Sequence, residues 1–263
     1  MGTLPLPSGL PLIVPPRYEV IGVEGLPEIA PGDDLARLIA GAAARQGTPL
    51  SARDLLVVSQ KIVSKSEGRM VRLSEVTPSP HARALAEELG RDPRLTEVIL
   101  SESRRVVRKE MGLLIVETHH GWVCANAGVD QSNVDADTAC LLPEDADRSA
   151  GALRDRLREL TGHELAIIIA DTFGRPWREG LANVAVGLAG LQPLRSYLGK
   201  RDPAGHVLQA TILALADEVA GAAEPVMGKL SRIPVAIVRG LDWESGDGSS
   251  RELLRDPTRD LFR

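Results

Sequence analysis

Two short polar runs contain residue types that could bind a metal ion and phosphate. They are NAGVDQSNVD, residues 126–135, and ADTFGRPWREG, residues 170–180. In the second run, the carboxylate of Asp171 and the hydroxyl of Thr172 are hard oxygen ligands of the kind that Mg²⁺ or Mn²⁺ prefers. Its arginines offer forked donors to phosphate oxygens. Either run alone equally fits a tight turn, because acids and amides are ordinary turn residues. Together they favour a metal and phosphate site.

A pair of lysines offers a second indication of phosphate. Lys61 and Lys65 follow an apolar run and are four residues apart, so on a helix both would lie on one face. Two neighbouring ammonium groups repel each other unless an anion lies between them, which suggests a bound phosphate. The alternative is a solvated helix face.

The familiar nucleotide motifs are absent from the sequence. Residues 221–231, GAAEPVMGKLS, resemble a P-loop, but six residues separate the two glycines and Leu230 follows the lysine. No G-x-G-x-x-G motif occurs either, so a nucleotide must be held by another scaffold. His119 and His120 are adjacent, and on a strand they would point to opposite faces, which disfavours a shared metal ion. Cys124 is most simply a core residue.

Strands and helices with no strict β-α-β alternation must position these residues. We therefore expect an α+β fold with two intimately joined subdomains, whose boundary the pattern does not place. Strands are expected at 18–23, 54–59, 165–170, 180–191 and 234–238, with a hairpin of 106–119 and 122–125 turning at His120–Gly121. Helices are expected from Asp33–Asp34, at 79–89 and 93–101, with Ala150, Leu153, Leu157 and Leu160 in register, and with Ile212, Leu215, Val219 and Ala222 on one stripe.

Composition narrows the class of protein. The chain has 263 residues and a formal net charge of -5, which argues against a nucleic-acid-binding protein. Two cysteines, Cys124 and Cys140, are too few for a disulfide-built secreted fold. The apolar N-terminal stretch contains five prolines and has no basic segment, so it is neither a signal peptide nor a membrane span. We expect a cytoplasmic protein with an N-terminal extension at residues 1–17 and one domain, made of the two subdomains, at 18–263.

Six segments in a fixed order resemble one family. The chain is similar, from about Val20 to Leu241, to the γ-glutamyl ligases that add glutamate to coenzyme F-420-0, a 5-deazaflavin cofactor, and it resembles their stand-alone form. The segments are GLPEIAPGDDLARLI, LLVVSQKIVSKSEGR, NAGVDQSNV, ELTGHELAIIIADTFGRPWREG, ADEVAGAAEPVMGK and PVAIVRGL.

The resemblance implies a GTP-dependent, GDP-forming ligase with an α+β fold peculiar to the family. It implies an intertwined homodimer, with the nucleotide near the subunit junction, and a divalent ion, Mg²⁺ or Mn²⁺; it also admits K⁺ as a further ion. The substrates would be F-420-0, L-glutamate and GTP, with no nucleic acid or membrane partner. The apolar run 180–191, with Ala182, Val184, Val186 and Leu188 on one side, could lie at the junction or be a buried strand within one chain.

The resemblance also implies roles for particular residues. By motif, the metal ligands match Asp130, Asp171 and Thr172, and no catalytic residue is assigned. Two positions depart from the family pattern. Lys229 stands where some relatives carry a glutamate ligand of a second metal ion, and Glu28 stands where an apolar residue is frequent. The GTP contacts match Leu26, Pro27, Glu28, Ile29, Gln60, Lys61, Lys65, Asn133, Met227, Gly228 and Lys229.

The bond to be made suggests the chemistry. A carboxylate does not form an amide directly, because oxide is a very poor leaving group, so F-420-0 would first be phosphorylated by GTP to an acyl phosphate. The α-amine of glutamate would then displace phosphate, with Lys65 and Arg175 as further sources of positive charge. A metal-dependent nucleotide phosphohydrolase or kinase could use the same groups. A deazaflavin- or nucleotide-binding protein without catalysis is the other alternative.

Overall fold

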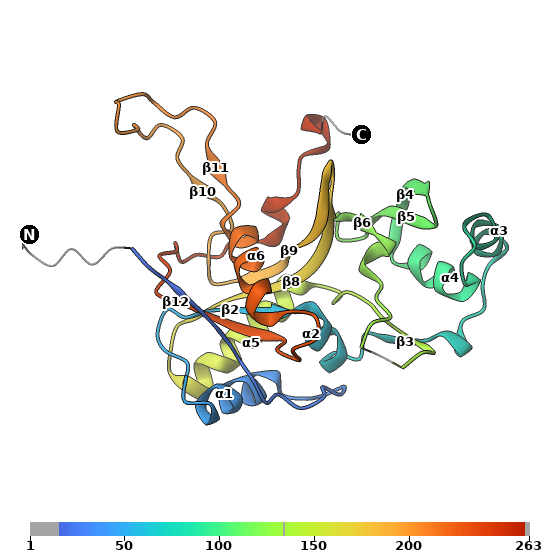
Figure 1. The fold of residues 1–263 in the computed structure, drawn as a ribbon, viewed down its shortest axis with the longest axis horizontal. Helices are drawn as coiled ribbons and strands as arrows, with labels where there is room; N and C mark the ends of the chain where they lie inside the picture. Colours follow the sequence, from blue (N-terminus) through green and yellow to red (C-terminus); the bar gives the residue numbers. More distant parts are fainter. Residues whose placement is uncertain (1–15, 134, 261–263) are drawn as a thin grey trace, which may run out of the picture.

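A mixed five-stranded sheet forms the centre of the protein. The computed structural model describes residues 16–133 and 135–260. Within the sheet the strand order is β1-β12-β2-β8-β9, and only the β2–β8 pair is parallel. Figure 1 shows these strands crossing the middle of the molecule. Their bounds are β1 (Glu19–Gly22), β12 (Val235–Arg239), β2 (Leu55–Ser59), β8 (Ala166–Arg175) and β9 (Arg178–Ala189).

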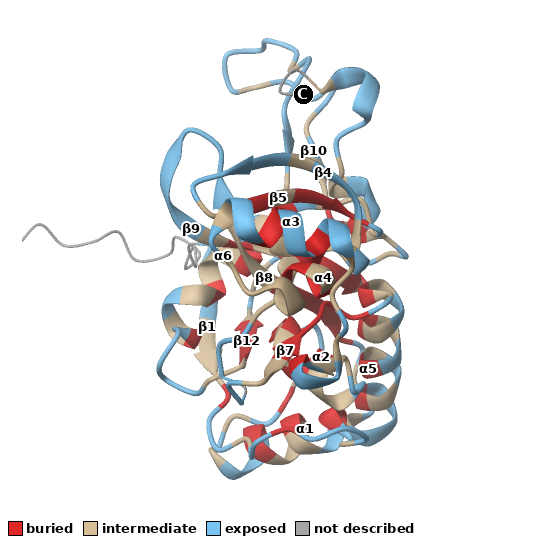
Figure 2. Cartoon of the chain, turned by 90° about the vertical axis from the view of Figure 1, so that its right-hand side faces the viewer, coloured by how far each residue is buried: buried red, intermediate tan, exposed pale blue. Residues whose placement is uncertain are grey.

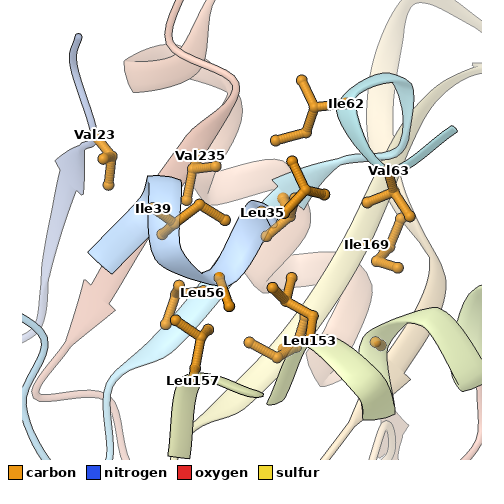
Figure 3. Close-up of a cluster of buried hydrophobic side chains, with 14 of the residues drawn as sticks. Val23, Leu35, Ile39, Leu56, Ile62, Val63, Leu153, Leu157, Ile169 and Val235 are labelled. Atoms are coloured by element: carbon orange, nitrogen blue, oxygen red, sulfur yellow. The ribbon is translucent and has the colours of Figure 1, made fainter. Parts of the chain in front are cut away.

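Both faces of this sheet are buried. Helices α1 (Leu35–Arg45) and α5 (Ala146–Thr161) cover one face, and α6 (Leu215–Met227) covers the other. Because side chains alternate along a strand, β2 supplies Leu56 and Val58 to the first face and Leu55 and Val57 to the second. Figure 3 shows Leu56 between residues of α1 and α5. This double burial explains why β2 is a continuous apolar run.

The helices begin and end at residues that the sequence marks. Asp34 and Asp145 accept hydrogen bonds from backbone N–H groups in the first turns of α1 and α5. Helix α5 ends at Gly162, which adopts φ 72°, a conformation that glycine takes at little cost. Four predictions are confirmed by these elements. The expected strands at 18–23, 54–59 and 234–238 are β1, β2 and β12, and the helix expected from Asp33–Asp34 is α1.

A smaller α+β region lies between α2 (Gln60–Ser66) and α5 along the chain. It has separate apolar clusters, built around Ile99 and Leu114 and around Leu73 and Val98. Figure 1 places it beside the central sheet, and Figure 2 shows buried residues on β5 (Leu113–Thr118), α3 (Pro80–Leu89) and α4 (Pro93–Ser101). The mixed α+β class is therefore confirmed. The region contains β3 (Met70–Arg72), α3 (Pro80–Leu89), α4 (Pro93–Ser101), β4 (Ser103–Glu110), β5 (Leu113–Thr118), β6 (Val123–Ala125) and β7 (Thr138–Cys140).

Two expectations for the strands were wrong. Residues 106–119 are not one strand, because the chain turns at Met111 and Gly112, both with positive φ. Two-residue hairpin turns usually contain Asn-Gly or Asp-Gly, so the Met-Gly pair did not indicate a turn. Strand β8 does not end before Asp171 but continues to Arg175, so residues 170–180 are mostly a β8–β9 hairpin. The polar composition of these residues reflects exposure of the hairpin tip, not a loop.

Three expected apolar faces also differ. A register shift between Ile169 and Ala170 places Val186 and Leu188 in the clusters on opposite faces of the sheet. Leu160, expected on the buried side of α5, is largely exposed. Ile212 lies outside α6, in a two-stranded arm of β10 (Arg195–Ser196) and β11 (Ile212–Leu213) that projects from the molecule in Figure 1.

Candidate functional site

The candidate site begins where the parallel pair β2–β8 ends. Strand β2 passes directly into α2, and Ser59 at its end pairs with Ala170. Asp171 and Thr172 therefore follow beside α2, which carries Lys61 in its first turn and Lys65 in its last. The carboxyl ends of parallel strands are a common place for a ligand site, because the following segments diverge there.

The acidic run joins this site through Asp130. Its backbone exchanges two hydrogen bonds with Cys140, which holds the loop against β7. The Asp130 carboxylate accepts from Ser132 N at 2.6 Å and Ser132 Oγ at 2.8 Å, and it lies 2.6 Å from Lys61 Nζ. Burial opposes ionisation, but the bonds and charge of Lys61 and Ser132 lower the pKa of Asp130. Asp130 is therefore an ionised carboxylate at neutral pH, held in a fixed orientation.

Lys65 anchors the next part of the same loop. Its ammonium group donates to the backbone carbonyl of Asn133 at 3.0 Å and forms an ion pair with Glu28. The Lys65 side chain is 11 % exposed, whereas that of Glu28 is 83 % exposed. A solvated carboxylate can leave a lysine at little cost, so the pairing with Glu28 leaves Lys65 available to another anion.

A second polar group surrounds Thr172. The Thr172 hydroxyl donates to Asn183 Oδ1 at 2.6 Å and accepts from Lys229 Nζ at 2.6 Å. Asn183 donates to Glu224 Oε2 at 2.8 Å, and Lys229 lies 3.0 Å from Glu224 Oε1. Strand β9 supplies the asparagine, and the end of α6 supplies the other two residues.

Asp171 lies within electrostatic reach of both groups. Burial, reinforced by the charge of Asp130, raises the pKa of Asp171 to about 6, while the backbone N–H of Thr172 and the charges of Lys61 and Lys229 oppose the rise. Burial and the charge of Asp171 together raise the pKa of the Cys124 thiol to about 12. Cys124 is therefore inert, and Asp171 is an acid whose charge is only partly balanced.

These donors fit a divalent cation. Asp130, Asp171 and Thr172 offer hard oxygens, and the unbalanced charge of the two carboxylates attracts a cation. Within the described ranges, 16–133 and 135–260, no cluster of three or more His, Cys, Asp or Glu side chains could hold a metal ion. A divalent ion here would take its remaining ligands from phosphate and water, as Mg²⁺ commonly does.

Some residues that were expected to contact the nucleotide have side chains that do not reach the surface of the site. The side chains of Gln60, Met227 and Ile29 are buried, and Gln60 accepts a hydrogen bond from Ser64. Contact of these three residues with a nucleotide would have to use their backbone. Leu26 packs partly buried against the core beneath the sheet, while Pro27 is exposed. Gly228 ends α6 beside Lys229.

Other charged and aromatic residues have contacts away from the candidate site. Arg175 donates to the carbonyl oxygens of Glu179 and Gly180, so it braces its own hairpin. Trp177 is 78 % exposed at the hairpin tip. His119 and His120 each interact with backbone carbonyls, consistent with a structural role.

Three residues of the site were not predicted from the sequence: Ser132, Asn183 and Glu224. Ser132 belongs to the polar run 126–135, but no function was predicted for it. Asn183 is an amide within an otherwise apolar strand, and a buried amide needs partners. That signal alone could have marked it, but nothing local indicated Thr172 and Glu224 as the partners.

Comparison with known proteins identifies the family. A family model described as F420-0:Gamma-glutamyl ligase matches residues 25–240. The chain belongs to this ligase family. A coenzyme F420:L-glutamate ligase of Methanothermobacter thermautotrophicus is 47 % identical over 247 residues, covering 93 % of this chain and 98 % of the relative. One from Methanopyrus kandleri is 46 % identical over 261 residues, covering 97 % and 100 %. One from Archaeoglobus fulgidus is 40 % identical over 248 residues, covering 94 % and 97 %.

The family match also establishes the general activity of the chain. The chain is a ligase of coenzyme F-420 biosynthesis. No helix among residues 16–133 and 135–260 combines the length and apolarity that crossing a membrane requires. The expected N-terminal extension falls almost wholly on residues 1–15, outside the described residues.

Asp171 should make the metal-free protein less stable as the pH rises. The unfolded chain releases this proton near pH 3.8 and the native state near pH 6, so between these values the native state binds more protons. Stability therefore falls as pH increases through this window, and the loss persists above it. Asp171→Asn removes this contribution and should melt above the wild type at pH 7 in a chelator.

The measurement is thermal unfolding from pH 4 to pH 8. Asp155→Asn, an exposed carboxylate on α5, is the matched control and should follow the wild-type curve. A melting temperature for Asp171→Asn well below that of the wild type at every pH would instead show that the carboxylate stabilises the fold.

Proposed function

We propose that this ligase uses GTP to join L-glutamate to the terminal carboxylate of coenzyme F-420-0, releasing GDP and phosphate. The observation that supports it best is the convergence of Lys61, Lys65, Asp130 and Asp171 at the end of β2 and β8. Lysines and a partly balanced acid pair are suited to hold a polyphosphate with its counter-ion.

The reaction divides into two displacements. A carboxylate oxygen of F-420-0 attacks the γ-phosphorus of GTP, the bond to the β-phosphate oxygen breaks, and GDP leaves. The α-amine of glutamate then attacks the carbonyl carbon of the acyl phosphate, and phosphate leaves with the former carboxylate oxygen. The amine loses its proton in this step. Positioning and charge neutralisation supply most of the catalysis in such phosphoryl transfers.

The residues of the chain have distinct parts in this scheme. Lys61 and Lys65 exchange their present partners, Asp130 and Glu28, for phosphate oxygens. Asp130, Asp171 and Thr172 would hold Mg²⁺ or Mn²⁺, which when bound offsets the negative charge of the phosphates. K⁺ remains a further candidate ion. Lys65 donates a hydrogen bond to the backbone carbonyl of Asn133, so the backbone of this loop would lie beside a nucleotide bound at Lys65.

Mass spectrometry of the products tests the proposed function. The expected product is F-420-0 carrying added glutamate, formed only when GTP, glutamate and Mg²⁺ or Mn²⁺ are all present. GDP should appear in step with it. GDP released without F-420-0 or glutamate would favour a nucleotide phosphohydrolase, and phosphorylated F-420-0 as the end product would favour a kinase.

GTP should be preferred to ATP in the same reaction. This expectation rests on the family resemblance, since no side chain of the site identifies itself as a guanine reader. The measurement is kcat/KM for each nucleotide at saturating F-420-0 and glutamate. Equal values for GTP and ATP would contradict the preference.

We also propose a homodimer. Exposed apolar side chains occur on the β10–β11 arm and at the β8–β9 hairpin tip, among them Leu198, Ile212 and Leu181. The apolar half of β9 is a poor junction, because its outer N–H groups at Ala185 and Leu188 donate to carboxylates of α6 and α5. Light scattering at micromolar concentration should give twice the chain mass. A fully active monomer would contradict the dimer.

A further inference from the structure

The polar side chains of the site form two groups with different charge balance. The first contains the carboxylates of Asp130 and Asp171 and the ammonium group of Lys61, so it retains one negative charge. The second contains Glu224 and Lys229 with two neutral residues, and it is electrically balanced. A divalent ion is therefore attracted to the first group and gains little from the second.

The second group is a closed ring of hydrogen bonds. Asn183 directs its amide nitrogen to Glu224, so its oxygen faces Thr172 and accepts the hydroxyl proton. With that proton committed, the remaining lone pairs of Thr172 Oγ1 can only receive a cation or a donor, and Lys229 Nζ is at 2.6 Å. The lysine thus occupies one of the two lone pairs at which a metal ion could meet this hydroxyl, and the other stays open toward Asp171.

The local backbone keeps Lys229 there. Helix α6 ends at Met227, and Gly228 turns the chain with φ 58°. Glu224 lies in the last helical turn, where the helix dipole places negative charge that favours a nearby cation. The side chain of Lys229 is still 59 % exposed, so its ammonium group can also reach a phosphate that enters from solvent.

We propose that Lys229 is a built-in cation, which replaces a second divalent ion beside Thr172. This inference rests on the proposed function, because it concerns the charges that face the nucleotide. The protein then binds one divalent ion per nucleotide, at Asp130, Asp171 and the open lone pair of Thr172. Lys229→Glu opens the second place, since Glu224, Thr172 and Asn183 already supply oxygens there.

Electron paramagnetic resonance with Mn²⁺ tests the inference. The full-length protein is saturated with a non-hydrolysable imido analogue of GTP and titrated with Mn²⁺. The wild type should bind one ion per chain, with the spectrum of an isolated Mn²⁺. Lys229→Glu should bind two, with the spin coupling of ions about 4 Å apart.

The controls separate this inference from the proposed function. Arg83→Glu reverses a charge on an exposed face of α3, away from the site, and should bind one ion like the wild type. Two coupled ions in the wild type would overturn the role of Lys229, and so would a single ion in a folded Lys229→Glu variant. A wild type that binds neither the analogue nor Mn²⁺ would contradict the proposed function as well. If Lys229→Glu does not fold, the wild-type stoichiometry alone decides.

Discussion

Replacing Asp130 or Asp171 by asparagine is expected to lower kcat by about 10²- to 10³-fold. Asparagine keeps the shape of the side chain but removes a charge that holds the cation, so the negative charge of the transferring phosphoryl group is less well offset. Both carboxylates belong to the group of Asp130, Asp171 and Lys61, which keeps a net negative charge, so the loss of either charge weakens its attraction for the cation. The measurement is steady-state product formation with GTP, F-420-0 and L-glutamate.

Thr172→Ala is the matched comparison and should have a smaller effect. Water can replace a neutral oxygen ligand, and Lys229 retains its second partner, Glu224. All three variants should keep the circular dichroism spectrum of the wild type. Normal turnover by folded Asp130→Asn and Asp171→Asn, combined with a sharply lower melting temperature, would make these residues structural and the metal assignment wrong.

Asp54→Ala is expected to cause the largest loss of stability, about 3 kcal/mol. Asp54 is 1 % exposed at the start of β2, and its two oxygens accept from Arg239 at 2.8 and 2.7 Å. It also accepts from the backbone of Ser51 at 2.7 Å. Removing it leaves the guanidinium of Arg239 without its carboxylate partner, although partial exposure of Arg239 keeps the cost at the lower end of such losses.

Urea denaturation measures this loss. Asp242→Ala is the control from the same end of the sheet, because its side chain is 94 % exposed and only distantly paired with Arg195. The control should leave the unfolding midpoint unchanged. An Asp54→Ala variant with the wild-type midpoint would show that the Asp54–Arg239 pair contributes nothing net.

Most elements of the fold were predictable from the sequence because their signals are local. An apolar run of β-branched and aliphatic residues predicted β2, and an aspartate before an apolar stripe predicted α1. The places where prediction failed lack such a signal. The Met111–Gly112 turn uses unusual residues, and the polar tip of the β8–β9 hairpin resembles a loop, because an exposed hairpin needs no apolar alternation.

Residue types and their spacing along the chain were enough to identify the candidate ligands and cations of the site. The two polar runs, the lysine pair and the ordered segments led to Asp130, Asp171, Thr172, Lys61 and Lys65, and to the family that the comparisons established. Such information is available locally, because residue type and spacing are sufficient to recognise donors of hard oxygen and of positive charge.

Which of these residues contact one another, and how their charges balance, depends on contacts between distant segments of the folded chain. The parallel pairing of β2 with β8 brings Asp171 beside α2, although more than one hundred residues separate them. Pairing of β9 with β8 delivers Asn183 to Thr172, and the end of α6 adds Glu224 and Lys229. These contacts join segments distant in the chain, so no local pattern encodes them. The difference in net charge between the Asp130–Asp171–Lys61 group and the Glu224–Lys229 group therefore arises only when the sheet has formed.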